Sequence, residues 1–298
     1  MRLENLRYFL AVADESSVGR AAHRLGVTQP ALTKGIQRLE QDLGLPLFER
    51  SAKGMTLTRV GASFLERVHL IALAMDDVVR EANDIRVGQA GKLRVGVAPQ
   101  FADELFSPAC ADLIAQRPGA RLEVHTHLND ALFDMLRRGD LDLCIAGLED
   151  RAHAEMEQIP LFPDEMCVGL RAGHPILSRP NLSFRDIAAE RWILPGRSVV
   201  ARRRLDERVA ELGLPPVNVV IEWSASIGHR LNLVRNTDLL TVLSLRLVRS
   251  EAGRGLTSVP LEQAVWIRQV GIAHRKGAYL SPLAHRLIEI LLEHSLHS

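Results

Sequence analysis

Residues 18–43 contain two helical patterns separated by a turn of three residues, and this spacing restricts the fold more than any other feature of the chain. Ser17 is a preferred N-cap for the first of these helices, over 18–25. Gly26 ends that helix, because glycine adopts the left-handed backbone of a helix C-terminus without strain. Thr28 caps the second helix, and a further amphipathic helix precedes the pair over 5–15. Two helices joined by so tight a glycine turn are typical of the helix-turn-helix arrangement.

The second helix of this pair has one apolar face and one polar face. Its apolar residues recur at steps of four, three and four: Leu32, Ile36, Leu39 and Leu43. The opposite face carries amides, hydroxyls and cations: Gln29, Thr33, Lys34, Gln37 and Gln41, with Arg38 flanking. Amides pair with adenine, and arginine or lysine pairs with guanine, in the major groove of DNA. The alternative is an ordinary solvated face, because any amphipathic surface helix is polar outside.

The residues that follow favour a nucleic-acid-binding surface. After Gly44 the segment PLFERSAKGMTLTRVG has two short β-prone pieces around 51–54, with Arg50, Lys53 and Arg59 on the outside. Residues 20–59 hold seven Lys or Arg against three Asp or Glu, whereas the formal net charge of the whole chain is only +1. A basic hairpin beside a helix-turn-helix is expected to act as a wing that contacts the phosphate backbone.

The run SVGRAAHRLGVTQPALTKGIQRLEQDLGLPLFERSAKGMTLTRVGASFL resembles the DNA-binding domain of LysR-type transcriptional regulators. The matching features are Ala21-Ala22, Leu25, Gln29-Pro30-Ala31-Leu32, Ile36, Leu39-Glu40, Leu43-Gly44, Leu47-Phe48, Arg50, Leu57-Thr58 and Gly61. With lower specificity the resemblance extends over the whole chain. It implies a winged helix-turn-helix over 1–60 that recognises double-stranded promoter DNA. The residues expected to contact DNA are Ser17, Thr28, Gln29, Pro30, Thr33, Lys34, Gln37, Arg38, Arg50 and Lys53.

A single long helix is predicted over 61–88. Its apolar residues follow a strict 4-3 spacing: Phe64, Val68, Ile71, Met75, Val78, Ala82 and Ile85. Such a seam buries itself best against a second copy of the same helix, which predicts a homodimer. The alternative is a helix packed on its own domain. The resemblance implies dimers as well, with tetramers built from them.

Residues 89–298 follow a different pattern, in which short strands alternate with helices. This alternation predicts an α/β domain with a parallel sheet, entered through a short glycine-containing hinge over 87–91. We expect two lobes, the first over 92–161 and 267–298 and the second over 162–266. The resemblance implies an effector domain like a type 2 periplasmic binding protein, with a ligand cleft between the lobes.

Polar residues that follow the predicted strands are the candidates for binding an effector, because ligands of such sheets sit beyond the carboxyl ends of the strands. They are Gln100, Phe101, Asn129, Gly196, Arg197, Ser198, Arg202, Ser224 and Ser226. Hydroxyl, amide and guanidinium groups near helix N-termini suit an anionic or polyhydroxylated small molecule. Helix capping is the alternative role for Asn129, Ser198 and Ser226. Gln100 stands where many family members have threonine or serine.

Several function classes are disfavoured by what the sequence contains. We expect no enzyme, no cofactor and no metal site, because no catalytic triad, phosphate-binding glycine loop or metal-ligand spacing occurs. Cys110, Cys144 and Cys167 are predicted to be inert and buried rather than redox-sensing. No secretion signal or transmembrane run is evident, so a cytoplasmic, nucleoid-associated protein is expected, with RNA polymerase as a further candidate partner. The remaining alternative is a solute-binding protein of a transport system.

Overall fold

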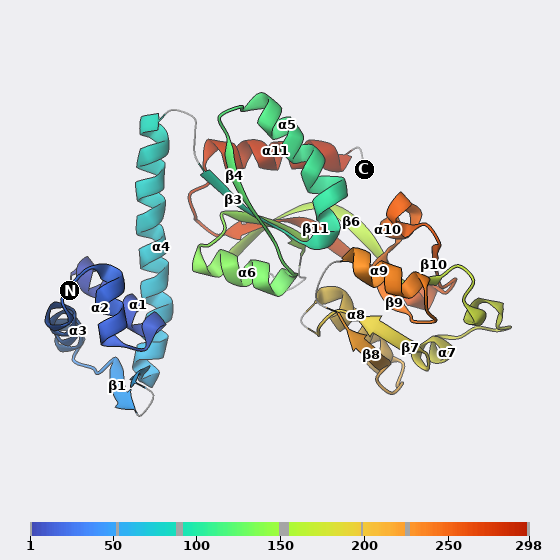
Figure 1. Ribbon diagram of the computed structural model, residues 1–298, viewed down its shortest axis with the longest axis horizontal. Helices are drawn as coiled ribbons and strands as arrows, with labels where there is room; N and C mark the ends of the chain where they lie inside the picture. Colours follow the sequence, from blue (N-terminus) through green and yellow to red (C-terminus); the bar gives the residue numbers. More distant parts are fainter. Residues whose placement is uncertain are drawn as a thin grey trace. The chain divides into compact units, whose positions relative to one another are not determined.

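The computed structural model describes residues 2–51, 54–87, 92–148, 155–197, 199–223 and 227–296 (Figure 1). The chain forms two compact units, Met1–Asn83 and Asp84–Ser298. Within the described residues, no helix combines the length and the apolar character needed to cross a membrane.

Unit one is a three-helix module followed by a hairpin and a long helix. Its elements are α1 (Leu3–Glu15), α2 (Val18–Leu25), α3 (Gln29–Leu43), β1 (Phe48–Ser51), β2 (Gly54–Leu57) and α4 (Arg59–Val87), which continues past the boundary of the unit. The helix-turn-helix and hairpin that the sequence predicts are therefore present. Gly26 has a φ of 66° and its N–H bonds the last carbonyls of α2, as the predicted glycine turn requires.

The core of unit one is built around Phe9 of α1. Its ring lies 5.2 Å from the ring of Phe48 in β1 and 5.2 Å from that of Phe64 in α4. The predicted apolar stripe of α3 is buried against this core at Leu32, Ile36 and Leu39, whereas Leu43 is exposed. Gly35 of α3 lies so close to Tyr8 that a Cβ would collide with its ring. Helices α1 and α3 are consequently fixed against each other.

The predicted seam of α4 divides into two parts. Val68 is only 1% exposed and belongs to the core of unit one, and Phe64 packs against that core. These two residues therefore pack within their own unit. The later positions differ, because Ile71 is 42%, Val78 64% and Ile85 76% exposed.

Unit two contains a seven-stranded mixed sheet and a separate pair of parallel strands. Its strands are β3 (Lys92–Val97), β4 (Arg121–Thr126), β5 (Leu143–Gly147), β6 (Met156–Arg171), β7 (Arg191–Leu194), β8 (Asn218–Glu222), β9 (Thr241–Ser244), β10 (Leu256–Ser258) and β11 (Val265–Arg275). The sheet order is β10-β6-β11-β5-β3-β4, with β9 also paired to β6, and β7 pairs with β8. The prediction of a parallel sheet is wrong, because β11 runs antiparallel to both β5 and β6.

The two longest strands, β6 and β11, connect the lobes. The carboxyl half of β11 contributes Val270 and Ile272 to the first apolar core, together with β3, β5 and helices α5 (Ser107–Gln116), α6 (Asn129–Arg138) and α11 (Pro282–Leu296). The carboxyl half of β6 contributes Met166 and Val168 to the second core. The two-lobed architecture is thus confirmed, with the last strand and helix returning to the first lobe (Figure 1).

The second lobe surrounds two further apolar clusters. Its helices are α7 (Phe184–Ala188), α8 (Val200–Glu211), α9 (Ile227–Arg235) and α10 (Leu245–Arg249). Trp192 of β7 is fully buried there, and its indole N–H donates to the carbonyl oxygen of Ile187 at 3.2 Å. Helices α8 and α9 each follow one strand of the parallel pair, so their N-termini lie at the same edge of it.

The segment 99–116 contains three successive helical turns of different kinds rather than one α-helix. Residues Pro99–Phe101 form a 3-10 turn and Ala102–Phe106 a π turn, before α5 begins at Ser107. The N–H of Ser107 bonds the carbonyl oxygen of Ala102, five residues back. Pro108 has no N–H to donate into an α-helical ladder, which accounts for the wider turn before it.

Candidate nucleic-acid interface and interlobe cleft

Two of the predicted DNA-binding residues accept hydrogen bonds at the N-termini of the two helices of the helix-turn-helix. The Ser17 hydroxyl accepts the N–H of Arg20 at 3.4 Å, and the Thr28 hydroxyl accepts the N–H of Ala31 at the same distance. Both are N-caps, which satisfy otherwise unpaired amides in the first turns of α2 and α3. Thr28 is exposed as well, so its hydroxyl and the first turn of α3 face solvent together.

The outer face of α3 carries the polar side chains that the sequence predicts. Gln29, Pro30, Lys34, Gln37 and Arg38 are exposed, and Thr33 is half-buried. Within the described residues, no hydrogen bond or ion pair joins Lys34, Gln37 or Arg38 to another side chain. The amides and cations of this face are therefore available to an external partner.

The arginines of the neighbouring helix α2, in contrast, form ion pairs with carboxylates of α1. Arg24 pairs with Asp14 at 3.0 Å and with Glu15 at 3.3 Å, and Arg20 pairs with Glu15 at 3.4 Å. The acidic end of α1 thus pairs with the arginines of α2, whereas Lys34 and Arg38 on the outer face of α3 have no such partner among the described residues. This distribution focuses positive potential on the face that could enter a groove.

The hairpin is held at a fixed place beside α3. Glu40 of α3 accepts the N–H groups of Leu47 at 2.7 Å and Phe48 at 3.2 Å, just where β1 begins. From the other strand, the N–H of Met55 donates to the carbonyl oxygen of Ser16 at 3.1 Å. Sequence reasoning noted Glu40 only as a family feature, although it links the helix to the wing. Lys53 lies outside the described residues, as does the side chain of Arg50.

A cavity of about 750 Å³ lies between the lobes of unit two. The first lobe lines it with Pro99, Gln100, Ala102, Asp103, Glu104, Thr126, His127, Leu128 and Ala131. The second lobe contributes Ile227, Gly228, Leu231, Leu247 and Ala252. Its size and largely apolar walls are typical of small-molecule sites. The π turn over Ala102–Phe106 supplies one wall, a distortion that is common at functional sites.

The predicted effector residues of the first lobe have different roles. Gln100 lines the cavity. Phe101 is buried, and the guanidinium of Arg268 lies 5.2 Å from the centre of its ring. Asn129 is also buried, and its amide donates to the carbonyl oxygen of Gly147 at 2.7 Å. Asn129 therefore joins α6 to the end of β5, and its side chain does not cap α6.

The predicted residues of the second lobe are only partly within the described chain. Gly196 is buried and Arg197 exposed, in the turn between β7 and α8. Arg202 is buried at 4% exposure, and its Nε donates to both carboxylate oxygens of Asp206 at 2.9 Å. Ser198, Ser224 and Ser226 lie outside the described residues.

A buried charge cluster where β6 and β11 cross was missed by sequence reasoning. Arg268 of β11 bonds Asp164 of β6 through Nη2 at 2.6 Å and through Nε at 2.8 Å, and the two residues are cross-strand partners. Ser244 donates its hydroxyl to the other carboxylate oxygen. The available signal was a charged residue inside each of two apolar strands, which a buried pair explains.

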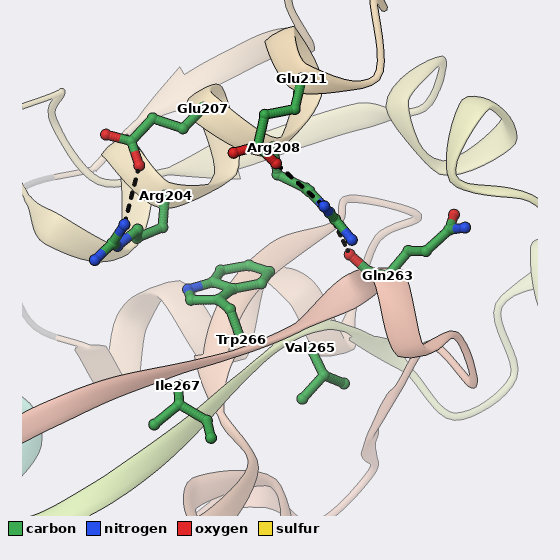
Figure 2. Close-up of a pocket in the computed structure, with 8 residues that line it drawn as sticks. All are labelled: Arg204, Glu207, Arg208, Glu211, Gln263, Val265, Trp266 and Ile267. Carbon is green, nitrogen blue, oxygen red and sulfur yellow. Dashed lines mark hydrogen bonds and ion pairs between the residues drawn. The ribbon is translucent and has the colours of Figure 1, made fainter.

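A second hollow of about 400 Å³ lies between α8 and the start of β11 (Figure 2). Its charged groups pair with one another: Arg204 with Glu207 at 3.4 Å and Arg208 with Glu211 at 3.1 Å. Arg208 also donates to the carbonyl oxygen of Gln263 at 3.4 Å. Pairs of this kind at i,i+3 are typical of a solvated helix face, so this hollow is the weaker candidate.

The three cysteines lack the features of a redox sensor. Cys144 and Cys167 are buried, and burial raises the pKa of each thiol to about 12. Burial also raises the pKa of Cys110. Since the thiolate is the reactive form, these shifts disfavour oxidation at neutral pH. In the described part of the chain, no group of three His, Cys, Asp or Glu side chains is arranged to hold a metal ion.

Family models match both units of the chain. The model described as "Bacterial regulatory helix-turn-helix protein, lysR family" matches residues 3–62, and "LysR substrate binding domain" matches residues 86–296. Among curated proteins, the HTH-type transcriptional regulator GbpR of Azospirillum brasilense is 30% identical over 295 residues, covering 98% of this chain and 86% of GbpR. The regulator PcaQ of Agrobacterium fabrum is 30% identical over 280 residues, covering 92% of this chain and 89% of PcaQ.

Solved structures of full-length chains show the same overall fold. A full-length OxyR variant from Pseudomonas aeruginosa is 28% identical with a TM-score of 0.60, covering 99% of this chain and 94% of that one. The structure of full-length CbnR complexed with its target DNA is 20% identical with a TM-score of 0.61, covering 99% of this chain and 100% of that one.

Proposed function

This chain belongs to the LysR family of bacterial helix-turn-helix regulators, and from that premise we propose that it reads promoter DNA with α3 and the β1–β2 hairpin. The observation that supports this most directly is the exposed face of α3, on which Lys34, Gln37 and Arg38 have no partner among the described residues. Amides and cations in this position can pair with base edges, and the hairpin can contact phosphates. The regulatory relatives and the N-terminal module disfavour the alternative of a solute-binding protein for transport.

The cleft between the lobes is the proposed effector site. Gln100 and the apolar side chains around it would enclose a small molecule, anionic or polyhydroxylated, that bridges the lobes. Such a ligand shifts the equilibrium between open and closed domains only by its difference in affinity for the two forms. We propose that closure changes how the paired DNA-binding units are spaced and hence how promoter DNA is bent, with RNA polymerase as the downstream partner.

Self-association through α4 completes the proposal. The later part of the 4-3 seam, Ile71, Met75, Val78, Ala82 and Ile85, is exposed except for the half-buried Met75, and it would pack against a second copy. Two modules related by a twofold axis read two half-sites, which one module cannot do. We expect Val78→Glu to shift the dimer toward monomer in sedimentation velocity, because it places a carboxylate in the apolar seam. Leu70→Glu is the control, since Leu70 is 54% exposed but lies off the seam; equal effects of both changes would contradict this interface.

The proposed function is tested by a gel shift with DNA from immediately upstream of the gene that encodes this chain. Random DNA of equal length is the control. We expect retardation of the upstream fragment at protein concentrations that leave the random fragment free. Weak binding that is equal on both fragments and is abolished by modest salt would contradict sequence-specific recognition of this site, since electrostatic contacts alone are indifferent to sequence.

A further inference from the structure

The buried pair of Arg268 and Asp164 makes two further contacts, one toward each wall of the cavity between the lobes. On one side, the guanidinium of Arg268 lies 5.2 Å from the centre of the Phe101 ring. On the other side, the Ser244 hydroxyl donates to the carboxylate oxygen of Asp164 that Arg268 does not bond. These four side chains therefore form one continuous series of contacts across the crossing strands.

Phe101 lies directly behind the first wall of the cavity. It is buried in the apolar core of the first lobe, and its neighbours in sequence, Gln100 and Ala102, both line the cavity. It is also the last residue of the 3-10 turn, after which the π turn begins. A guanidinium within about 6 Å of an aromatic ring is attracted to the negative face of that ring, and more strongly where water is excluded. Any displacement of this wall consequently alters a contact of Arg268.

Ser244 begins the helix that carries part of the second wall. It is the N-cap residue of α10, yet its hydroxyl makes no capping hydrogen bond. A serine at this position usually accepts an N–H of the first turn. Here the hydroxyl donates to Asp164 instead, and Leu247, three residues later, lines the cavity. The start of α10 is therefore positioned by the crossing strands and not by its own cap.

Helix α10 has a second contact with the crossing strands. The guanidinium of Arg246 lies 4.6 Å from the centre of the Phe162 ring, and Phe162 of β6 packs against the core of the first lobe. The lobes are thus joined on both sides of the buried pair by a guanidinium against an aromatic ring. The pair itself consists of hydrogen bonds, which weaken steeply when they are bent, so it is the fixed point of this arrangement.

Stability alone is a poor explanation for a buried ion pair, because the desolvation of two charges offsets much of their attraction. Its larger effect is on which arrangements are allowed, since either charge is costly in the interior without its partner. Resting on the proposed function, we propose that Arg268 is a positioning residue that couples the two walls of the cavity. Displacement of the wall at Phe101 then changes the placement of α10, and the two walls move together when the lobes close.

Hydrogen–deuterium exchange of the full chain, without any added ligand, tests this coupling. Phe101→Leu removes the aromatic face and keeps an apolar side chain in the core. We expect exchange in the peptide that covers α10 to rise by about 2- to 10-fold, in line with the loss of one buried cation–ring contact. Phe133→Leu is the matched control, because Phe133 is a buried phenylalanine of the same core. Unchanged exchange of α10 in Phe101→Leu, or an equal rise in Phe133→Leu, would overturn the proposal.

The coupling should also be visible from the second wall. We expect Ser244→Ala to raise exchange in the segment Pro99–Phe106 of the first lobe, by a factor similar to that seen in the reverse direction. Ser183→Ala is the control, because Ser183 is also an N-cap serine of the second lobe whose hydroxyl donates to a carboxylate, that of Asp186 at 2.6 Å. No change at Pro99–Phe106 in Ser244→Ala, or the same change in both variants, would mean that the two walls are independent.

A conservative change separates positioning from the filling of space. Arg268→Lys keeps a cation beside Asp164 and loses the planar guanidinium over Phe101, whereas Arg268→Gln loses the charge as well. Exchange of α10 in Arg268→Lys should therefore lie between that of the native chain and that of Arg268→Gln, with thermal unfolding used to verify that each variant is folded. Identical exchange of α10 in the native chain and in folded Arg268→Gln would contradict a positioning role.

A parallel gel shift distinguishes this inference from the function on which it rests. If the upstream DNA is retarded specifically while Phe101→Leu leaves α10 unchanged, the coupling is wrong and the regulatory function stands. If Phe101→Leu and Ser244→Ala each affect the opposite wall while no specific retardation occurs, the proposed function fails and the coupling stands as a property of the two-lobed domain.

Discussion

The two units of this chain differ in the exposure and the pairing of their cationic side chains. In unit one the cations of α3, such as Lys34 and Arg38, are exposed and without partners in the described chain. In unit two Arg268 is buried and bonded to Asp164 at the crossing of β6 and β11, and Arg202 is buried beside Asp206. The first arrangement suits a large polyanion that approaches from outside, and the second suits a small ligand that is enclosed.

The difference shows why the same residue type serves two kinds of recognition. Exposed cations contribute modest, salt-screened attraction and need many contacts, which a DNA duplex provides. A buried guanidinium acts in a medium of lower dielectric constant, where one anion can alter a conformational equilibrium. In both units a carboxylate fixes the position of a neighbouring element. Glu40 of α3 hydrogen-bonds the start of the hairpin, and Asp164 of β6 hydrogen-bonds Arg268 of β11.

The largest effect should come from breaking the buried pair. Asp164→Ala leaves Arg268 buried without its carboxylate, and we expect it to lower the free energy of unfolding by about 3 to 5 kcal/mol. Urea unfolding of the full chain measures this. The control is Glu251→Ala, which breaks the exposed pair with Arg254 and should have little effect. Similar losses in both variants would mean that burial does not distinguish the two pairs.

An intermediate effect is expected at the DNA-reading face. Gln29→Ala should cost about 1 to 3 kcal/mol of discrimination between the target and random DNA, because an amide that pairs with a base edge is lost. Fluorescence anisotropy with both DNAs measures the ratio of affinities. Gln41→Ala removes an exposed amide from the far end of α3 and should preserve that ratio. If Gln29→Ala weakens binding to both DNAs equally, this helix does not read bases.

The smallest effect should be seen at the cysteines. Since the pKa of Cys144 and Cys167 is raised to about 12, their thiols stay protonated in the folded chain at pH 7 to 8. We expect thiol-labelling reagents to modify both slowly in the native chain and rapidly in urea, where the pKa returns to the ordinary value near 9. The corresponding contribution to stability is present below pH 9 and is lost as pH rises toward 12. Rapid native labelling by mass spectrometry would contradict this.

The sequence was most informative where structure depends on neighbouring residues. Helix α2 spans the predicted 18–25 and α3 begins at the predicted Gln29, because caps and glycine turns act locally. It was less informative for β6, which spans Met156–Arg171 and therefore includes Pro160 and Pro163. The register of β6 against β11 shifts between Val270, which pairs with Phe162, and Gly271, which pairs with Pro160, so Pro160 lies beside a bulge, where proline is tolerated.

The candidate sites show the same contrast. The exposed residues of α3 could be named from periodicity alone. Arg268 and Asp164 are separated by 104 positions, so their pairing depends on the tertiary crossing of two strands and no local pattern predicts it. Likewise, the amide of Asn129 donates to the carbonyl oxygen of Gly147, a bond to another element that no local pattern predicts.

Hydrogen–deuterium exchange of the full chain, with and without the upstream DNA, tests the assignment of DNA reading to unit one most directly. We predict that DNA slows exchange in the turn before α3, in the first turn of α3 and in the β1–β2 hairpin, and leaves the crossing strands β6 and β11 unchanged. Protection centred on unit two, with the amides around Thr28 and Gln29 unaffected, would contradict the account.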